Sequence, residues 1–155
     1  MKSRHGMRRF AAAVILSFLA SALSGQLSAE PNKLQYELQE RCGKAAAAKF
    51  ASDHPEGPEI RTKDDFTVYK YENHYNATLN KCFLKYTMRI VKYKSSSDPG
   101  YTTTDMALFD VNENKQYGYF LRFSFQQFPD YCIMRDKTCT SEEEWQDFVK
   151  PFMED

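Results

Sequence analysis

The stretch KCFLKYTMRIVKYK, residues 81–94, decides the fold. Its side chains alternate between an apolar or aromatic set (Cys82, Leu84, Tyr86, Met88 and Ile90) and a charged or hydroxyl set (Lys85, Thr87 and Arg89). A period of two is typical of a β-strand with one dry face and one wet face. Because an antiparallel sheet can leave one face in water, this stretch predicts a strand of an antiparallel sheet.

Three further stretches have the texture of strands, at 66–71, 102–111 and 117–125. The segment SSSDPG at 95–100 has the composition of a loop, and NENK at 112–115 has that of a tight hairpin turn. We therefore expect an antiparallel sheet of about four strands.

Residues 34–52 have the texture of a helix before the sheet. Asn32 suits the N-cap position, and the alanines at 45–48 are the strongest helix formers. Gly43 weakens the helix by about 1 kcal/mol relative to alanine, and its missing side chain would let another element approach closely. The apolar side chains recur at steps of three and four at Leu34, Leu38, Cys42, Ala45 and Ala46.

A second helix is predicted after the sheet. Ser141 and Glu144 have the spacing of a capping box, and Pro151 is expected to bend or end the helix. An apolar stripe follows the cap at Trp145, Phe148, Val149 and Phe152. We expect this stripe to pack on the sheet, and the alternative is a helix that binds a partner.

Together these elements predict a single small α+β domain over residues 30–155. Its order is an N-terminal helix, an antiparallel sheet of about four strands and a C-terminal helix. We expect both helices on one face of the sheet.

Residues 1–29 have the three-part layout of a secretory signal peptide. Segment 10–23 carries no charge, and a region of small residues follows it and ends at Ala29. The basic region before it contains Lys2, Arg4, Arg8 and Arg9. Cleavage is expected after Ala29; cleavage after Ser24 and an uncleaved N-terminal anchor are the alternatives. The layout predicts a periplasmic or secreted bacterial protein with no membrane attachment after cleavage.

Composition and charge narrow the class of protein. Charged residues make up 27% of the chain and hydrophobic residues 42%, which excludes a wholly disordered chain and a multispan membrane protein. Residues 1–29 contain four basic residues and no acidic one. The remaining chain therefore has 17 basic and 21 acidic residues, a net charge of −4. A mildly acidic domain is not expected to bind nucleic acid, which requires a concentrated basic face.

Four cysteines follow residue 29, at Cys42, Cys82, Cys132 and Cys139. An even number in a small exported domain is typical of two disulfides. Three pairings are possible, and we favour Cys42–Cys82 with Cys132–Cys139 because the second pair brackets a short loop. The spacing of Cys132 and Cys139 is wider than that of a zinc or redox motif, so no metal or cofactor is predicted.

The candidate binding site is YENHYN, residues 71–76, the densest polar and aromatic cluster of the chain. Its candidate residues are Tyr71, Asn73, His74, Tyr75 and Asn76. Rings and amides of this kind can bind a ligand, and the alternative is a turn whose asparagines adopt special backbone angles. The chain contains no sequence motif of a serine hydrolase, zinc protease or nucleotide-binding loop, so no catalytic residue is predicted.

Three segments carry a family resemblance: HYNATLNKCF (74–83), LFDVNENKQYGYF (108–120), and the Cys132–Cys139 region followed by SEEEWQDFVKPFMED (141–155). They resemble segments of an uncharacterised family of small exported bacterial proteins with four cysteines. The resemblance implies a standalone exported domain with this cysteine layout. The family has no known activity, so no catalytic residue carries over.

The resulting functional hypothesis is an exported, non-enzymatic binding or accessory domain of the bacterial envelope. It would present a sheet face or loops to another envelope or extracellular protein. Two alternatives remain: a hydrolase-type envelope enzyme that uses His74, and a structural or assembly protein that binds through the C-terminal helix. An exposed Trp145 would favour the assembly alternative.

Overall fold

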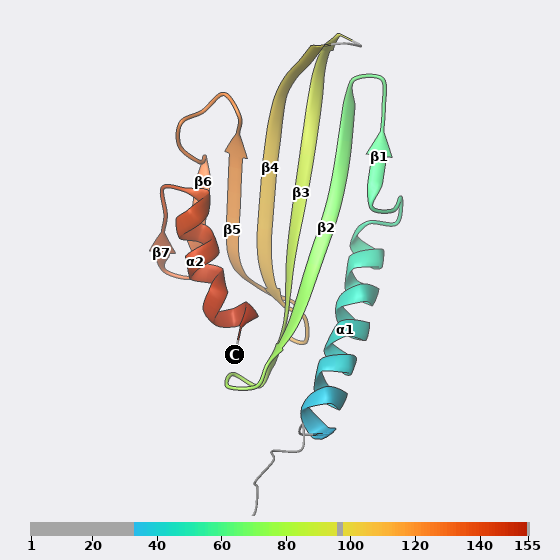
Figure 1. Ribbon diagram of the computed structural model, residues 1–155, viewed down its shortest axis with the longest axis vertical. Coiled ribbons are helices and arrows are strands. Elements are labelled where there is room, and N and C mark those ends of the chain that lie inside the picture. Colours follow the sequence, from blue (N-terminus) through green and yellow to red (C-terminus); the bar gives the residue numbers. More distant parts are fainter. Residues whose placement is uncertain (1–32, 96–97, 155) are drawn as a thin grey trace, which may run out of the picture. The chain divides into compact units, whose positions relative to one another are not determined.

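The computed structural model describes residues 33–95 and 98–154, which form one antiparallel sheet with a helix at each end of the sequence (Figure 1). Helix α1 spans Lys33–Asp53 and helix α2 spans Glu142–Met153. The strands are β1 (Glu59–Arg61), β2 (Asp65–Asn76), β3 (Lys81–Ser95), β4 (Asp98–Asp110), β5 (Lys115–Phe123), β6 (Tyr131–Met134) and β7 (Lys137–Thr138). The predicted signal peptide at 1–29 and the predicted N-cap Asn32 lie outside the described residues.

The sheet has seven strands, and each strand pairs antiparallel with the next one in sequence. The helix–sheet–helix order and the antiparallel pairing agree with the prediction, but the expected number of about four strands is wrong. The three unpredicted strands are short: β1 has three residues, β6 has four and β7 has two. The predicted hairpin turn at 112–115 is confirmed, because β4 ends at Asp110 and β5 begins at Lys115.

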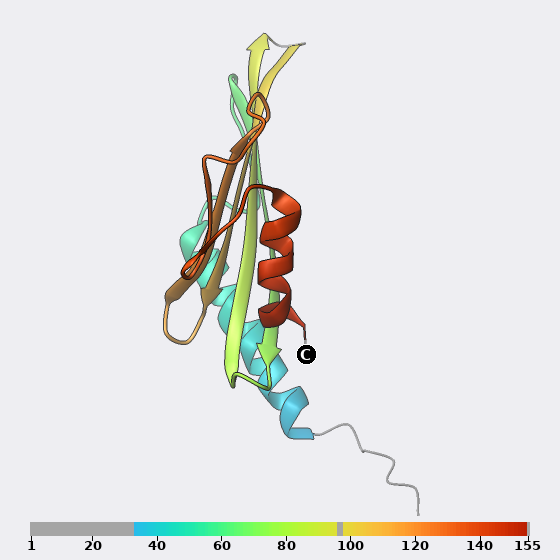
Figure 2. The same ribbon diagram turned by 90° about the vertical axis from the view of Figure 1, so that its left-hand side faces the viewer.

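The two helices cover opposite faces of the sheet (Figure 2). Successive side chains of a strand point to opposite faces. On β3, Cys82 packs with Cys42 of α1, whereas the neighbouring Phe83 packs in the core that contains Trp145 of α2. The expectation of both helices on one face is therefore wrong. The start of β3 is buried on both faces, because consecutive residues Cys82, Phe83 and Leu84 are all buried. One helix therefore packs on each face of the sheet.

The larger core lies between the sheet and α2, where Trp145 and Val149 are buried. The sheet contributes Phe83, Met106, Leu108, Tyr117, Phe120, Cys132 and Met134. The predicted cap is confirmed: the Ser141 hydroxyl accepts a hydrogen bond from the Glu144 backbone N–H, at 3.1 Å. The helix continues to Met153, so Pro151 does not end it.

Two disulfides tie the helices and short strands to the sheet, and both are the predicted pairs. Cys42–Cys82 joins α1 to β3 with its Cα atoms 5.3 Å apart. Cys132–Cys139 joins β6 to the segment before α2 with its Cα atoms 5.0 Å apart. These disulfides are consistent with an oxidising environment. No helix within 33–95 and 98–154 is long and apolar enough to cross a membrane.

Candidate functional site

The predicted cluster at 71–76 lies within strand β2, and the turn follows it at 77–80. The alternation of the strand divides its residues between two faces. Tyr71, Asn73 and Tyr75 lie on the α1 side, whereas His74 and Asn76 lie on the α2 side. The turn interpretation is therefore wrong for these residues, and the structure does not gather them on one surface. Their proposed binding role stays a prediction.

The α1-side residues of this cluster hold the helix on the sheet. Gln39 of α1 donates from Nε2 to Asn73 Oδ1 at 3.2 Å, and its Oε1 accepts from the Tyr75 backbone N–H at 2.8 Å. The Tyr75 hydroxyl donates to Asn80 Oδ1 at 2.6 Å. On the other side of β2, His74 is half-buried and pairs in register with Phe83.

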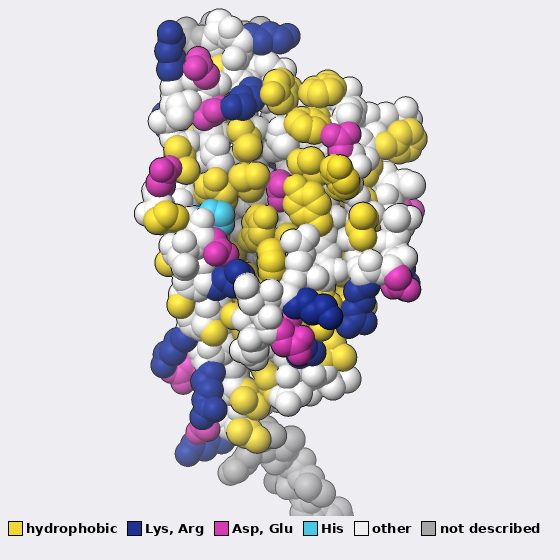
Figure 3. Space-filling model, turned by 180° about the vertical axis from the view of Figure 1, so that it is seen from behind, with side chains coloured by type: hydrophobic (Ala, Val, Ile, Leu, Met, Phe, Trp, Pro, Cys, Tyr) yellow, Lys and Arg dark blue, Asp and Glu magenta, His cyan; other side chains and the backbone are white. Residues whose placement is uncertain are grey.

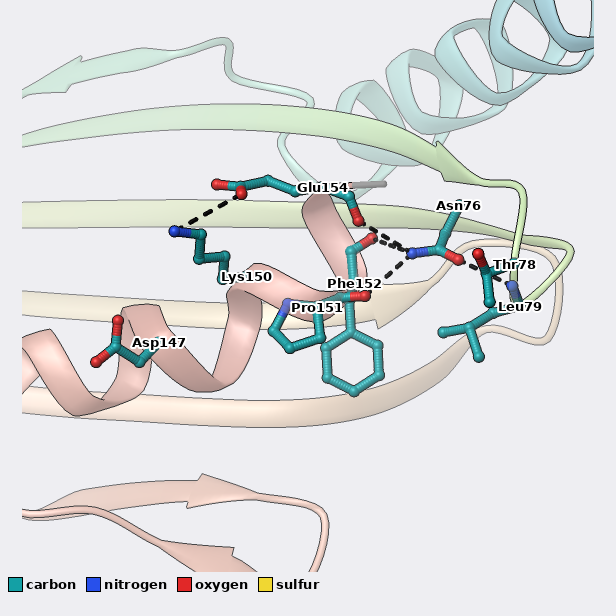
Figure 4. Close-up of a pocket in the computed structure, with 8 residues that line it drawn as sticks. All are labelled: Asn76, Thr78, Leu79, Asp147, Lys150, Pro151, Phe152 and Glu154. Atoms are coloured by element: carbon teal, nitrogen blue, oxygen red, sulfur yellow. Dashed lines mark hydrogen bonds and ion pairs between the residues drawn. The ribbon is translucent and has the colours of Figure 1, made fainter.

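Asn76 holds the end of α2 against the β2–β3 turn (Figure 4). Its Nδ2 donates to the Pro151 carbonyl at 3.1 Å, and its Oδ1 accepts from the Leu79 backbone N–H at 2.8 Å. Asn76 is 2% exposed, and its two bonds join a carbonyl in the last turn of α2 to a backbone N–H of the β2–β3 turn. A pocket beside it is lined by Asn76, Thr78, Leu79, Asp147, Lys150, Pro151, Phe152 and Glu154. These contacts explain Asn76 as a structural residue.

On the α1 side of the sheet, the helix covers β2 and part of β3 and leaves much of β4 to β6 uncovered. Helix α1 packs on β2 and β3, where Phe50 contacts Tyr71 with ring centroids 4.5 Å apart. It reaches β4 through Lys49, whose ammonium lies 5.0 Å from the ring centroid of Phe109. Beyond these contacts, no helix among the described residues packs on this side of β4, β5 and β6.

Apolar side chains cover this open part, which we call the open face. Figure 3 looks onto this side of the sheet and shows hydrophobic side chains gathered over it. Six of its members are half-buried: Tyr86, Met88, Ile90, Tyr119, Leu121 and Phe123. Four are exposed: Tyr101 by 39%, Phe125 by 68%, Tyr131 by 54% and Ile133 by 42%.

Strand register makes the open face continuous. Met88, Asp105 and Leu121 lie opposite one another on β3, β4 and β5, and Leu121 in turn lies opposite Tyr131 on β6. Side chains opposite one another on adjacent strands are in contact range. On the α2 side, the same length of these strands is mixed. Thr87, Arg89, Thr102, Thr104 and Arg122 are polar, whereas Met106 and Phe120 are buried in the core under α2. Among the described residues of β3 to β6, the exposed large apolar side chains are Tyr101, Tyr131 and Ile133, and all of them lie on the open face.

A buried carboxylate lies at the centre of the open face. Asp105 is 7% exposed. The Tyr119 hydroxyl donates to its Oδ2 at 2.6 Å, and the Tyr86 hydroxyl donates to its Oδ1 at 3.4 Å. Ala107, fully buried between the two tyrosines in register, has a small side chain that leaves their hydroxyls free to converge on Asp105.

Asp105 differs from the other buried carboxylate of β4. Asp110 is paired with the Lys81 ammonium. No Lys, Arg or His within the described ranges forms an ion pair with Asp105. Burial raises the pKa of the Asp105 carboxyl, and the two tyrosine hydrogen bonds oppose part of that rise. Burial, with the nearby Asp105 charge, also raises the pKa of Tyr86 to about 12.

The raised pKa of Asp105 predicts a pH-dependent difference between the protein and its Asp105→Asn variant. Above the ordinary carboxyl pKa of 3.8, the unfolded chain loses this proton while the folded chain retains it. The folded state then binds more protons, so its stability falls as pH rises through the raised pKa. Urea denaturation of both proteins across this range should show the wild type losing free energy of unfolding relative to the variant. A difference that stays constant with pH would contradict the assignment.

Comparisons with protein-family models, curated proteins and solved structures find no match. In the part of the chain that the structure describes, no group of three or more His, Cys, Asp or Glu side chains is placed to hold a metal ion. The geometry of the open face and its central carboxylate makes them the candidate site. Sequence reasoning missed them, although it placed Tyr86, Met88 and Ile90 correctly on one parity of β3.

Proposed function

We propose that the chain is a non-enzymatic binding domain that presents the open face to another protein. The observation that carries this proposal is the open face itself, with nine apolar or aromatic side chains on four adjacent strands and a tenth, Phe125, just after β5. A soluble protein rarely leaves a broad apolar surface in water unless that surface binds something. Tyrosine and phenylalanine are enriched at protein interfaces, and tyrosines and phenylalanines make up six of the ten members.

The compartment in which this binding would occur follows from the cysteines and the N-terminal sequence. Both disulfides support folding in an oxidising place. The layout of residues 1–29 adds the features of an export signal. The proposed setting is therefore the bacterial periplasm or the outside of the cell, with another envelope or extracellular protein as the partner.

The two alternative functions have less support from the geometry. The apolar stripe of α2 is used inside the domain, because Trp145 and Val149 are buried against the sheet. His74 lies on the α2 side of β2, away from Tyr71 and Tyr75, which were its expected partners in a site. Neither observation favours an assembly role for α2 or catalysis by His74.

Site-specific photo-cross-linking tests the proposal in the cells that produce the protein. The photoreactive residue p-benzoylphenylalanine replaces Tyr131 on the open face in one variant and Tyr36 of α1 in the other. Both positions are aromatic and similarly exposed, at 54% and 63%. We expect a discrete cross-linked product from position 131 and none of that size from position 36.

The proposal is tested by the difference in cross-linking between positions 131 and 36. Equal cross-linking at both positions, or no product at position 131 while position 36 gives one, would contradict the open face as the binding surface. Each replacement preserves an aromatic ring at an exposed position, so both variants are expected to fold. Far-ultraviolet circular dichroism of the two variants checks this.

A further inference from the structure

We infer that the open face binds a basic side chain of the partner protein, with arginine preferred over lysine, and that Asp105 is the acidic group that pairs with it. This inference rests on the proposed function, because it names the chemistry of the partner at the same surface. The partner segment would carry its basic residue between apolar neighbours.

Asp105 has no cationic partner among the described residues. Asp105 is buried in the sheet face, and its hydrogen-bond donors among the described residues are the neutral hydroxyls of Tyr86 and Tyr119. The other buried carboxylate of β4, Asp110, has Lys81 beside it. A buried carboxylate is costly unless a cation or several hydrogen bonds compensate it. A cation brought by a partner would complete the Asp105 site.

Aromatic rings surround the Asp105 carboxylate. Tyr86 and Tyr119 flank Asp105, and the ring of Tyr131 lies 6.2 Å from that of Tyr119, centroid to centroid. Cations bind to the faces of aromatic rings, and the attraction grows when water is excluded. A guanidinium is planar, less strongly hydrated than an ammonium, and stacks on rings while it bonds a carboxylate. The site therefore favours arginine.

Apolar side chains surround Asp105 and its two tyrosines. Met88 and Leu121 lie on either side of Asp105, and the exposed Tyr101 and Ile133 lie further out on the open face. Interfaces with this layout place a polar or charged anchor among apolar contacts that exclude water. The basic residue of the partner would accordingly be flanked by apolar side chains.

The same carboxylate argues against a second copy of this chain as the occupant. A symmetric dimer buries the same patch on both subunits, so open faces stacked about a two-fold axis would bring the two Asp105 carboxylates toward one another in a dry interface. Like charges buried together are destabilising. The chain after residue 29 also has a net charge of −4, which complements a basic partner.

Two tripeptides test the inference on the protein as the producing cells process it, with both disulfides intact. The probes are acetyl-Leu-Arg-Leu-amide and acetyl-Leu-citrulline-Leu-amide, which differ in the charge of one side chain. Binding is measured from backbone amide shifts in proton–nitrogen NMR spectra during titration. We expect the arginine peptide to shift the amides around Asp105, Tyr86 and Tyr119, with an affinity about tenfold above that of the citrulline peptide.

The Asp105→Asn variant supplies the matched protein control, and we expect it to bind both peptides equally weakly. Equal affinity of the unaltered protein for both peptides, at the open face, would overturn the role of Asp105 but leave the proposed binding function in place. Shifts confined to other surfaces, or no shift at all, would overturn the inference as well. The cross-linking result at position 131 then decides separately whether the proposed function fails too. The peptide comparison on the unaltered protein needs no variant, so it stands even if Asp105→Asn misfolds.

Discussion

Replacing Trp145 with alanine is expected to lower the free energy of unfolding by about 3–5 kcal/mol. Trp145 is fully buried between α2 and the sheet, and its ring lies 6.1 Å from that of Phe120, centroid to centroid. Its indole Nε1 has no hydrogen-bond partner among the described residues, so the loss comes from packing and not from a broken hydrogen bond. The substitution leaves a cavity in the larger of the two cores.

Urea denaturation followed by far-ultraviolet circular dichroism measures this effect, because the variant lacks the single tryptophan that fluorescence would report. The control is Phe125→Ala, which removes an exposed ring of the open face and should change the free energy of unfolding by less than about 0.5 kcal/mol. If Trp145→Ala were as stable as Phe125→Ala, α2 would not be packed on the sheet as described.

Removing the Cys42–Cys82 disulfide by the double substitution Cys42→Ser and Cys82→Ser should cost about 4 kcal/mol. This bond closes a loop with a sequence separation of 40 and ties α1 to the interior strand β3. A cross-link over a long loop restricts the unfolded chain strongly, and both cysteines are replaced so that no free thiol remains to form other pairs. Such a loss is a large fraction of the stability of a small domain.

The second disulfide provides the matched control for this experiment. Cys132–Cys139 has a sequence separation of seven, so the double substitution Cys132→Ser and Cys139→Ser should cost about 2.5 kcal/mol. Thermal or urea denaturation of the two double variants measures which one loses more free energy of unfolding. A greater loss from the Cys132–Cys139 pair would contradict the role given to the bond between α1 and β3.

Much of the fold could be predicted because local signals and tertiary contacts agree. The alternation at 81–94 identified an interior strand of the sheet and the two sides to which its side chains point. The Ser141 cap was readable because its hydrogen bond lies within four residues. The short separation of Cys132 and Cys139 pointed to their pairing for the same reason.

The short strands and the placement of the helices could not be read in this way. A strand of two or three residues, as in β1 and β7, shows at most one alternation. The sequence YCIM of β6 has apolar or aromatic residues throughout, so it lacks the alternation of polar and apolar residues that marks a strand with one face in water. The faces that α1 and α2 cover depend on long-range contacts, Cys42 with Cys82 and Trp145 with Phe120, which no local pattern encodes.

The candidate site was missed for a related reason. Parity on β3 predicts that Tyr86, Met88 and Ile90 share a face, but it does not say how far along that face a helix extends. The environment of Asp105 depends on its neighbours Met88 and Leu121, which belong to different strands and meet it through register. The cluster at 71–76 drew attention by composition, whereas its residues alternate between two faces.

The most direct test of the account is the ratio of photo-cross-linking yields from positions 131 and 36 in the producing cells. Both side chains are exposed in the described structure, and Tyr131 belongs to the open face while Tyr36 belongs to α1. We expect one discrete partner product that forms from position 131 and not from position 36. A ratio near one, or products from position 36 alone, would contradict the open face as the surface through which this domain binds.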